Sequence, residues 1–382
     1  MLLQGVENGK RRALVLGRGK SGEAAAELLA RQGFDVSFAE DLSLVVASPG
    51  LPVKSELQIG CEELLRRGWK LLAVTGSKGK SSVVKVVADA LSLAGLNGVP
   101  CGNYGRPVSD LLSEEPGWAV VEISSFQLET TALPAGSFVA SAILNIQEDH
   151  LDRHGDVSVY AALKMRLKTM SHMHFEGLEK RSSAEVDALL PFADFCALTK
   201  GTYFDNDVLR INAAYAVALM RAAGLDDAII RRAFENFKPL AHRFQKIAEI
   251  DGVTYIDDSK ATSLSALSAA VSMCEPASRV RLIAGGLPKG DDPKSVLPTL
   301  TDRVEKVYLI GRCAQVFCAA WADAVDCVVC GDLSRAVAEA MREACCGEIV
   351  LLSPGCASFD QFTDFGSRGD VFADLVRKGK RK

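Results

Sequence analysis

The segment that most limits the possible folds of this chain is the glycine- and lysine-rich stretch Thr75–Ser82, with the sequence TGSKGKSS. An apolar, strand-like run, Leu71–Val74, comes directly before it, and a helical pattern from Ser81 to about Ala94 follows. A strand, a glycine-rich turn and a helix in this order bring backbone N–H groups and a lysine around a phosphate. The motif therefore predicts a phosphate-binding turn, in which Lys80 neutralises phosphate oxygens and Ser81 holds Mg²⁺.

Strand-like and helical patterns alternate along the rest of the chain, which predicts an α/β protein. A length of 382 residues suits two or three domains. We predict three successive α/β domains. They are a Rossmann-like N-terminal domain over 1–68, a P-loop ATPase-like central domain over 69–239 and a Rossmann-like C-terminal domain over 240–382.

Charge and cysteine content exclude several classes of protein. The net charge is -4 and no basic stripe stands out, so we expect no nucleic-acid partner. No apolar run approaches the length of a membrane span. The 11 cysteines, an odd number scattered through apolar segments, predict free thiols in a reducing, cytoplasmic location. Cys327 and Cys330 are expected on a buried strand rather than at a metal site.

A second glycine-rich turn, Gly17–Gly22, follows the apolar run Ala13–Leu16 and fits the pattern G-x-G-x-x-G, with Glu40 ending the next predicted strand. Its glycines permit a tight turn and let a diphosphate approach a helix N-terminus. NAD and UDP are both candidate ligands, and a tight turn without a nucleotide fits the pattern equally well.

Acidic and basic side chains follow the next predicted strands. Glu122 ends one strand, His150 follows another, and Lys164 lies on a predicted helix. Because the ends of neighbouring parallel strands meet at one sheet edge, Glu122 and His150 are candidate metal ligands near the phosphates. The alternative is that each is a solvated or capping residue. The remaining histidines of this region are expected on the surface: His154, His172 and His174.

Three loops in the last third of the chain carry cations and hydroxyls after predicted strands. Lys260 and Thr262 follow the first of these strands, Lys289 the second and Ser358 the last. Loops in this position bind the ligands of α/β sheets, and this mixture of groups suits a dicarboxylate. Each loop taken alone is also consistent with a simple turn.

Four stretches together resemble the Mur ligase family, and within it the branch that adds D-glutamate. They are Glu122–Glu129 (EISSFQLE), Leu144–Arg153 (LNIQEDHLDR), Asp258–Thr262 (DSKAT) and Leu352–Phe362 (LSPGCASFDQF). The resemblance covers most of the chain. The last two stretches separate this branch from its sister ligases, and the Asp-Asn-Pro-Arg signature of the enzymes that add diamino acids is absent.

The resemblance implies an ATP-dependent amide ligase of peptidoglycan synthesis that adds D-glutamate to UDP-N-acetylmuramoyl-L-alanine. In that reaction the L-alanine carboxylate is phosphorylated to an acyl phosphate, the D-glutamate amine attacks it, and phosphate leaves. The implied cofactors are ATP and Mg²⁺, whose charge would neutralise the anions that must meet. The implied partners are the two substrates, with no membrane, and we expect a monomer.

The resemblance also assigns roles to residues by their places in the motifs. The implied catalytic residues are Lys80, Glu122, His150 and Lys164. Those implied for ATP are Gly76, Ser77, Lys78, Gly79, Lys80, Ser81, Ser82, Asn212, Arg243 and Asp258. Those implied for the metal are Ser81, Glu122, His150 and Lys164, the last if it is carbamylated as in this family rather than a plain lysine. Those implied for the UDP-sugar are Ser21, Glu40, Gly50, Asn103, Ser124 and Gln127, and those for D-glutamate are Lys260, Thr262, Lys289, Ser358 and Phe365.

The chain departs from the family pattern in several places. Members are typically longer, and the segments 41–48 and 164–212 are shortened here. An adenine contact is expected to be missing near Leu209, and Asp257 stands where Asn is usual. These departures leave a second hypothesis, a paralogue that binds its ligands without catalysis. A third, an NAD(P)-dependent oxidoreductase, depends on Gly17–Gly22 alone.

Overall fold

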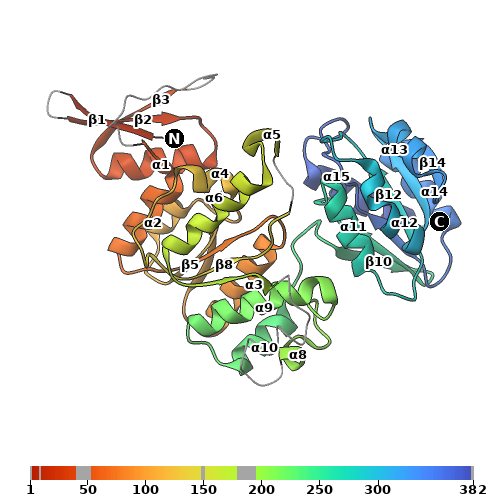
Figure 1. Cartoon of the computed structure of the whole chain (residues 1–382), viewed down its shortest axis with the longest axis horizontal. Coiled ribbons are helices and arrows are strands. Elements are labelled where there is room, and N and C mark those ends of the chain that lie inside the picture. Colours follow the sequence, from red (N-terminus) through yellow and green to blue (C-terminus); the bar gives the residue numbers. More distant parts are fainter. Residues whose placement is uncertain (1, 8–9, 40–52, 148–150, 179–194, 380–382) are drawn as a thin grey trace. The chain divides into compact units, whose positions relative to one another are not determined.

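The computed structural model describes residues 2–7, 10–39, 53–147, 151–178 and 195–379. By their contacts these residues divide into two compact units, Met1–Phe237 (unit 1) and Lys238–Lys382 (unit 2) (Figure 1). Three sheets alternate with helices, so the predicted multi-domain α/β fold is confirmed. The division of unit 1 into two domains near residue 68 stays a prediction. Within the described ranges, no helix has the length and apolar character needed to cross a membrane.

The first sheet of unit 1 has four strands in the order β3-β2-β1-β4. The strands and their helix are β1 (Leu2–Glu7), β2 (Lys10–Leu16), α1 (Lys20–Arg31), β3 (Phe34–Ala39) and β4 (Val53–Lys54). β2 and β3 are parallel and joined by α1, as predicted. β1, which the sequence patterns do not indicate, pairs antiparallel with β2 and β4. Gly22 is required here because a Cβ atom on it would lie 2.2 Å from the carbonyl oxygen of Gly17.

The second sheet of unit 1 is fully parallel, in the order β6-β7-β5-β8-β9. Its strands are β5 (Lys70–Thr75), β6 (Gly98–Gly102), β7 (Trp118–Glu122), β8 (Phe138–Ile143) and β9 (Ser171–Glu176). The helices are α2 (Glu56–Arg66), α3 (Lys80–Leu93), η1 (Val108–Ser113), α4 (Ser125–Thr130), α5 (Leu151–His154), α6 (Val157–Thr169), α8 (Phe195–Thr199), α9 (Asp207–Ala222) and α10 (Asp227–Asn236).

Alternate residues of β5 are buried on opposite faces of this sheet. Leu71 and Ala73 join an apolar cluster that also contains Val15 of the first sheet and Leu28 of α1, so the two sheets of unit 1 share a core. Helix α3 packs against β5, β7, α9 and α10. The parallel arrangement brings the carboxyl ends of β5, β7 and β8 together at one edge.

Unit 2 contains a six-stranded sheet in the order β10-β11-β15-β12-β13-β14, parallel except for β10. The strands are β10 (Gln245–Ile250), β11 (Val253–Asp257), β12 (Val280–Gly285), β13 (Val304–Ile310), β14 (Asp326–Gly331) and β15 (Ile349–Leu352). The helices are α11 (Leu264–Met273), η3 (Pro293–Val296), α12 (Leu297–Arg303), α13 (Ala314–Trp321), α14 (Leu333–Glu343) and α15 (Phe365–Gly379). One apolar cluster joins the sheet to α11, α12 and α13, and another joins it to α14 and α15.

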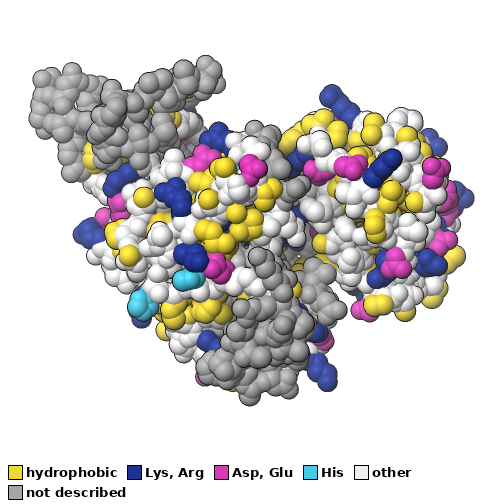
Figure 2. All heavy atoms as spheres, viewed as in Figure 1, with side chains coloured by type: hydrophobic (Ala, Val, Ile, Leu, Met, Phe, Trp, Pro, Cys, Tyr) yellow, Lys and Arg dark blue, Asp and Glu magenta, His cyan; other side chains and the backbone are white. Residues whose placement is uncertain are grey.

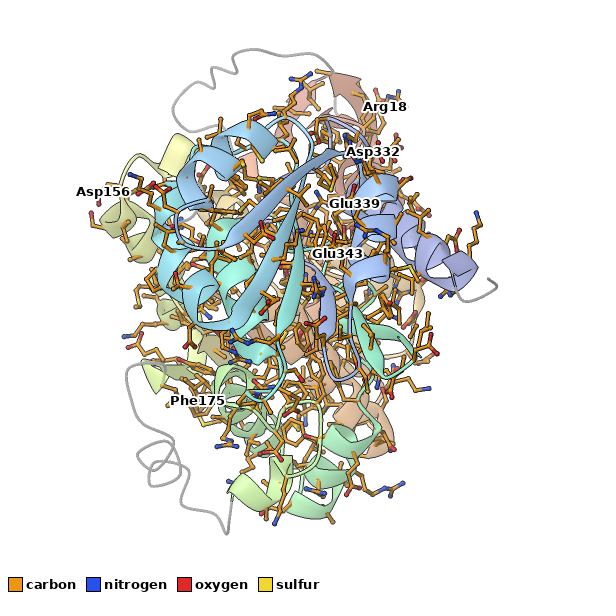
Figure 3. The ribbon with its side chains drawn as sticks, turned by 90° about the vertical axis from the view of Figure 1, so that its right-hand side faces the viewer. Arg18, Asp156, Phe175, Asp332, Glu339 and Glu343 are labelled. Carbon is orange, nitrogen blue, oxygen red and sulfur yellow. The ribbon has the colours of Figure 1, made fainter. Side chains whose placement is uncertain are left out.

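Acidic residues lie at both ends of helix α14 and make different contacts (Figure 3). Asp332 caps its N-terminus by accepting a hydrogen bond from the Arg335 backbone N–H. At the other end, a Glu343 carboxylate oxygen accepts a 2.9 Å hydrogen bond from Tyr308 and lies 3.1 Å from the Lys306 ammonium group. The Glu343 contacts hold α14 against β13, whereas the Asp332 cap lies within the helix.

The sequence patterns predict free cysteine thiols and a surface without a basic stripe. Cys327 and Cys330 lie on a strand, β14, as predicted, but β14 is at the edge of the sheet and of the two only Cys330 is buried. The ten cysteines whose side chains are described are all free thiols. Acidic and basic side chains are interspersed on the face shown in Figure 2.

Candidate active site

The predicted phosphate loop joins β5 to α3, and an asparagine from the neighbouring strand holds it. The Ser77 N–H donates to the Asn145 backbone carbonyl at 2.8 Å. The Asn145 side chain accepts from the Lys78 N–H at 2.9 Å and donates to the Lys78 carbonyl at 3.0 Å. Sequence reasoning missed Asn145, although its place directly after β8 was an available signal.

Two glycines of the loop sit where a side chain would collide with its surroundings. A Cβ atom on Gly76 would lie 2.9 Å from the Cβ of Leu144. Gly79 has a φ of +85° and precedes α3, and a Cβ atom on it would lie 2.6 Å from the Asn212 side-chain oxygen. The structure thus brings the predicted residue Asn212 against the loop, at the N-terminus of α3.

The two lysines predicted to be catalytic converge on one backbone carbonyl. Lys80 Nζ donates to the Gly76 carbonyl at 2.8 Å and to the Ser77 carbonyl at 3.0 Å. Lys164 Nζ donates to the same Gly76 carbonyl at 3.0 Å and lies 4.3 Å from the centre of the Tyr160 ring. Lys164 is only 1% exposed. Two cations in one place create a strong field for anions.

Glu122 ends β7 beside the start of α3, and its carboxylate is 2% exposed. One carboxylate oxygen accepts a 2.7 Å hydrogen bond from the Ser81 hydroxyl, and the other accepts one of 2.7 Å from the Asn103 amide. Carboxylate and hydroxyl oxygens are hard donors that fit Mg²⁺. His150, the further predicted ligand, lies outside the described residues, within which no group of three His, Cys, Asp or Glu forms a metal site.

A cavity of about 310 Å³ lies where the first glycine-rich turn faces α4. Its lining includes Gly17, Gly19, Ser21 and Gln127. Ser124 and Gln127 form a capping box at the start of α4, in which each side chain bonds the backbone of the other. The structure therefore brings Ser21 and Gln127 together. Two other residues predicted for this ligand, Glu40 and Gly50, lie outside the described residues.

The prediction that His154 lies on the surface is wrong. Only 8% of it is exposed, its Nε2 lies 3.0 Å from the Ser125 hydroxyl, and its Nδ1 lies 3.5 Å from Glu129. Its ring also packs against Phe126 and Tyr160. Apart from Tyr160, these partners are distant in sequence, so local patterns carried no sign of the burial. His172 and His174 are exposed on β9, as predicted.

In unit 2 the structure pairs four of the residues predicted to bind D-glutamate. Lys260 Nζ lies 3.9 Å from the centre of the Phe365 ring, and Lys289 Nζ donates to the Thr262 hydroxyl at 3.1 Å. Ser358 is 2% exposed and lies in the loop after β15. The two ammonium groups follow β11 and β12, both neighbours of β15.

The predicted residues Arg243 and Asp258 lie near the start of unit 2. The Asp258 carboxylate accepts hydrogen bonds of 3.0 Å from the Phe244 N–H and from the Ser353 hydroxyl. Burial raises the pKa of Asp258 to about 7, and the hydrogen bonds from Ser353 and Phe244, with a smaller effect of Arg243, partly oppose the increase. Next to it, Asp257 lies 2.7 Å from His242 Nδ1. His242 and Phe244 have positive φ values, so these contacts hold a bent backbone.

Arg368 was missed by sequence reasoning and links two of the motif loops. It is 1% exposed and donates to the Ser259 hydroxyl and carbonyl at 2.9 and 2.8 Å. It also donates to the Cys356 carbonyl at 3.2 Å. Burial lowers the pKa of Arg368 to about 10. The Arg368 contacts hold the Lys260 and Ser358 loops at a fixed spacing.

Comparison with known proteins gives two family matches. Residues 74–178 match the family described as Mur ligase middle domain, and residues 242–356 match the one described as Mur ligase, glutamate ligase domain. The first contains the phosphate loop and Glu122, and the second contains Lys260 and Lys289.

Relatives are similar over nearly the whole chain. The UDP-N-acetylmuramoylalanine–D-glutamate ligase of Methylobacillus flagellatus is 32% identical, over 97% of this chain and 98% of that protein. A protein of the same name from Acidobacterium capsulatum is 33% identical, over 96% of each. Both alignments span 447 positions, so these relatives contain residues that this chain of 382 lacks.

Solved structures share the fold. The MurF ligase of Thermotoga maritima in complex with ADP has a TM-score of 0.59 and 14% identity, covering 97% of this chain and 95% of that one. MurC, the UDP-N-acetylmuramate–alanine ligase of Thermotoga maritima, also has a TM-score of 0.59 and 14% identity, with 96% and 99% covered.

Proposed function

The chain belongs to the Mur ligase family, and we propose that it joins D-glutamate to UDP-N-acetylmuramoyl-L-alanine in an ATP-dependent step of peptidoglycan synthesis. The observation that carries the proposal is the 32% identity, over 97% of the chain, to a protein named for this reaction. One alignment thus includes the phosphate loop of unit 1 and the lysine-bearing loops of unit 2.

The phosphate loop is the proposed ATP site. The loop's backbone N–H groups other than those of Ser77 and Lys78, together with the Lys80 ammonium group, bind the phosphates, and the clasp from Asn145 holds the loop in its shape. Lys80 is held by two carbonyls, so it is already oriented before the nucleotide arrives. Arg243 and Asp258 of unit 2 are proposed as further ATP-contacting residues.

Ser81 and Glu122 are the proposed protein ligands of Mg²⁺, with His150 as a third. When bound, Mg²⁺ would reduce the repulsion between the nucleotide phosphates and the attacking carboxylate. The Asn103 amide bonds the second oxygen of Glu122 and thereby orients the carboxylate.

The proposed reaction has two steps, and both pass through anionic transition states. An oxygen of the L-alanine carboxylate attacks the γ-phosphorus of ATP and ADP leaves, which forms an acyl phosphate. The neutral amine of D-glutamate then attacks the acyl carbon, phosphate leaves, and the amine loses a proton as the amide forms. The Lys80 ammonium stabilises the charge that develops in the first step. Lys164 is proposed to be carbamylated, which would turn this buried cation into an anionic metal ligand.

The two substrates are proposed to bind different units, the UDP-sugar in unit 1 and D-glutamate in unit 2. The cavity beside Ser21 and Gln127 takes the UDP-sugar, with its diphosphate at the N-terminus of α1. The D-glutamate carboxylates bind the ammonium groups of Lys260 and Lys289, assisted by the hydroxyls of Thr262 and Ser358 and by Phe365. Because ATP and UDP-sugars are cytoplasmic metabolites, we place the reaction in the cytoplasm. We separately propose that the protein is a monomer.

The test is phosphate release from Mg-ATP in the presence of UDP-N-acetylmuramoyl-L-alanine, with D-glutamate or L-glutamate as the amine. Release that requires both the UDP-sugar and D-glutamate supports the ligase. The Lys80→Ala variant should abolish release. The matched control is Lys85→Ala, which removes a lysine further along α3 that pairs with Asp89.

Two other outcomes would change the assignment. Binding of the UDP-sugar or of D-glutamate without phosphate release would favour the paralogue that has lost catalysis. Release that is equal with D- and L-glutamate would contradict the proposed amino-acid specificity.

A further inference from the structure

Two cysteines of unit 2, distant in sequence, lie side by side in its core. The Sγ atoms of Cys313 and Cys356 are 3.4 Å apart, and each residue is 1% exposed. Cys313 follows β13 and precedes α13, whereas Cys356 lies in the loop after β15. Since β12 separates these strands in the sheet, the two thiols meet across its carboxyl end.

The loops that carry the thiols are packed closely around the end of β12. The Cys313 N–H donates to the Gly286 carbonyl at 3.1 Å, and Leu287 and Ala357 exchange two backbone hydrogen bonds of 2.9 and 3.0 Å. A Cβ atom on Gly286 would lie 2.4 Å from the Ala357 carbonyl oxygen. The backbone next to the thiols is therefore hydrogen-bonded to the segment that leads to Lys289 and lies beside Ser358.

We propose that Cys313 and Cys356 form a reversible dithiol–disulfide pair, a modification site for small hydroperoxides. A disulfide needs its sulfur atoms about 2.05 Å apart, so a movement of somewhat more than 1 Å closes the bond. Both thiols are 1% exposed, so oxidation requires the loops around them to open locally before a peroxide can reach the sulfur atoms.

The chemistry balances with a hydroperoxide as oxidant. The Cys313 thiolate attacks a peroxide oxygen, the O–O bond breaks, and Cys313 becomes a sulfenic acid while one water or alcohol leaves. The Cys356 sulfur then attacks the Cys313 sulfur, the S–O bond breaks, and hydroxide leaves as water with the proton from Cys356. Two thiols lose two electrons and two protons in total, and the peroxide is reduced.

The order of attack follows from the contact between the thiols. The hydrogen bond from Cys356 lowers the pKa of Cys313 and raises the pKa of Cys356. The thiolate is the nucleophilic form, so Cys313 reacts first and Cys356 resolves the sulfenic acid.

The disulfide should weaken the binding of D-glutamate, and this consequence depends on the proposed function. Drawing Cys356 toward Cys313 displaces the loop that leads to Ser358. Misplacement of a binding group by about 1 Å can reduce the rate by up to about a hundredfold, so we expect the KM for D-glutamate to rise about tenfold. The KM for ATP should change less, because the phosphate loop lies in unit 1 and only Arg243 and Asp258 among the proposed ATP contacts lie in unit 2.

The decisive experiment treats the full-length protein with hydrogen peroxide and maps its cysteines by peptide mass spectrometry. We expect a peptide pair joined through Cys313 and Cys356 that disappears after treatment with dithiothreitol. The matched control replaces the exposed neighbours Cys345 and Cys346 with serine, and the cross-link should persist in this variant. Oxidation confined to other cysteines, or sulfinic acid at Cys313 without a cross-link, would overturn the proposal.

Kinetics before and after peroxide separate this site from the proposed function. In Cys313→Ala, and independently in Cys356→Ala, the rise in the KM for D-glutamate should be absent. Oxidised wild-type protein with an unchanged KM would overturn the coupling between the thiols and the loop. The cross-link is measured without any substrate. If the protein forms the cross-link on oxidation but its reduced form has no ligase activity, the proposed function is contradicted and the disulfide proposal is not.

Discussion

At the scale of single residues, Asn145 shows how one side chain can prepare the phosphate loop for its ligand. Its amide makes two hydrogen bonds to the Lys78 backbone. Each contributes a net stabilisation of about 0.5–1.5 kcal/mol. We expect Asn145→Ala to weaken ATP binding about tenfold, measured by isothermal titration calorimetry. Ser92→Ala, which removes an exposed hydroxyl near the far end of α3, serves as the control. Unchanged ATP affinity in folded Asn145→Ala protein would show that the clasp is dispensable.

Asp258 predicts a dependence of stability on pH. Its pKa is about 7 in the folded protein against 3.8 for an ordinary aspartate. Below about pH 4 the carboxyl is protonated in both the folded and the unfolded protein, so it does not change the free energy of unfolding. Between about pH 4 and 7 only the folded protein keeps the proton, so the free energy of unfolding falls as the pH rises. Above about pH 7 the carboxyl is ionised in both the folded and the unfolded protein, so the free energy of unfolding no longer changes with pH through this group.

The size of this loss is limited by solvent. A shift from 3.8 to about 7 corresponds to at most about 4 kcal/mol. Part of the side chain is accessible to water, so we expect about 1–2 kcal/mol. Urea unfolding between pH 5 and 8 should show a smaller decline for Asp258→Asn than for wild type, whereas the exposed-residue control Asp323→Asn should follow wild type. Parallel curves for Asp258→Asn and wild type would rule out Asp258 as the source.

At the scale of elements, local sequence predicted the helices and strands that carry the phosphate loop but not the contacts between distant segments. The apolar run 71–74 and the helix from Ser81 to about Ala94 correspond to β5 and α3. Strand β1 was missed because its pairing with β2 and β4 is tertiary. Arg368 was missed for a similar reason, since its partners Ser259 and Cys356 come from loops after other strands. Local sequence patterns therefore predict helices, strands and their turns. Hydrogen bonds between distant loops cannot be predicted from them, because these loops come together only when the sheet has formed.

Helix α15 depends on a glycine for its fit against the start of unit 2. A Cβ atom on Gly369 would lie 2.1 Å from His242 Nδ1 and 2.6 Å from an Asp257 carboxylate oxygen. Alanine usually stabilises a helix relative to glycine by about 1 kcal/mol, but overpacking here costs about 1–3 kcal/mol. We therefore expect Gly369→Ala to lower the free energy of unfolding by up to about 2 kcal/mol, measured from urea midpoints.

The same helix contains the control for this prediction. At Gly366 the nearest atom to an added Cβ is the Asp364 oxygen that accepts a hydrogen bond from the Ser367 N–H, at 3.2 Å, so the added methyl group is far less crowded than at Gly369. Gly366→Ala should be neutral or slightly stabilising. Equal changes for both variants would mean that the space beside His242 does not limit the helix.

At the scale of the whole molecule, the distribution of apolar clusters predicts that unit 2 folds without unit 1. Both clusters that cover its sheet consist of residues from Phe244 onward. The cut before Lys238 leaves Phe237 buried in unit 1, where its ring lies 4.9 Å from that of Phe204. We expect a fragment of residues 238–382 to be folded and to unfold cooperatively in urea, as monitored by circular dichroism.

A shorter fragment tests whether the start of unit 2 contributes to this stability. Residues 252–382 lack β10, the contact of His242 with Asp257 and the hydrogen bond from the Phe244 N–H to Asp258. Leaving the partly buried Asp258 carboxylate short of one partner costs about 1 kcal/mol, and the loss of β10 exposes an edge of the sheet. The shorter fragment should therefore unfold at lower urea or fail to fold. Equal midpoints for the two fragments would place the boundary of the folding unit at β11, and an unfolded 238–382 fragment would show that unit 2 depends on unit 1.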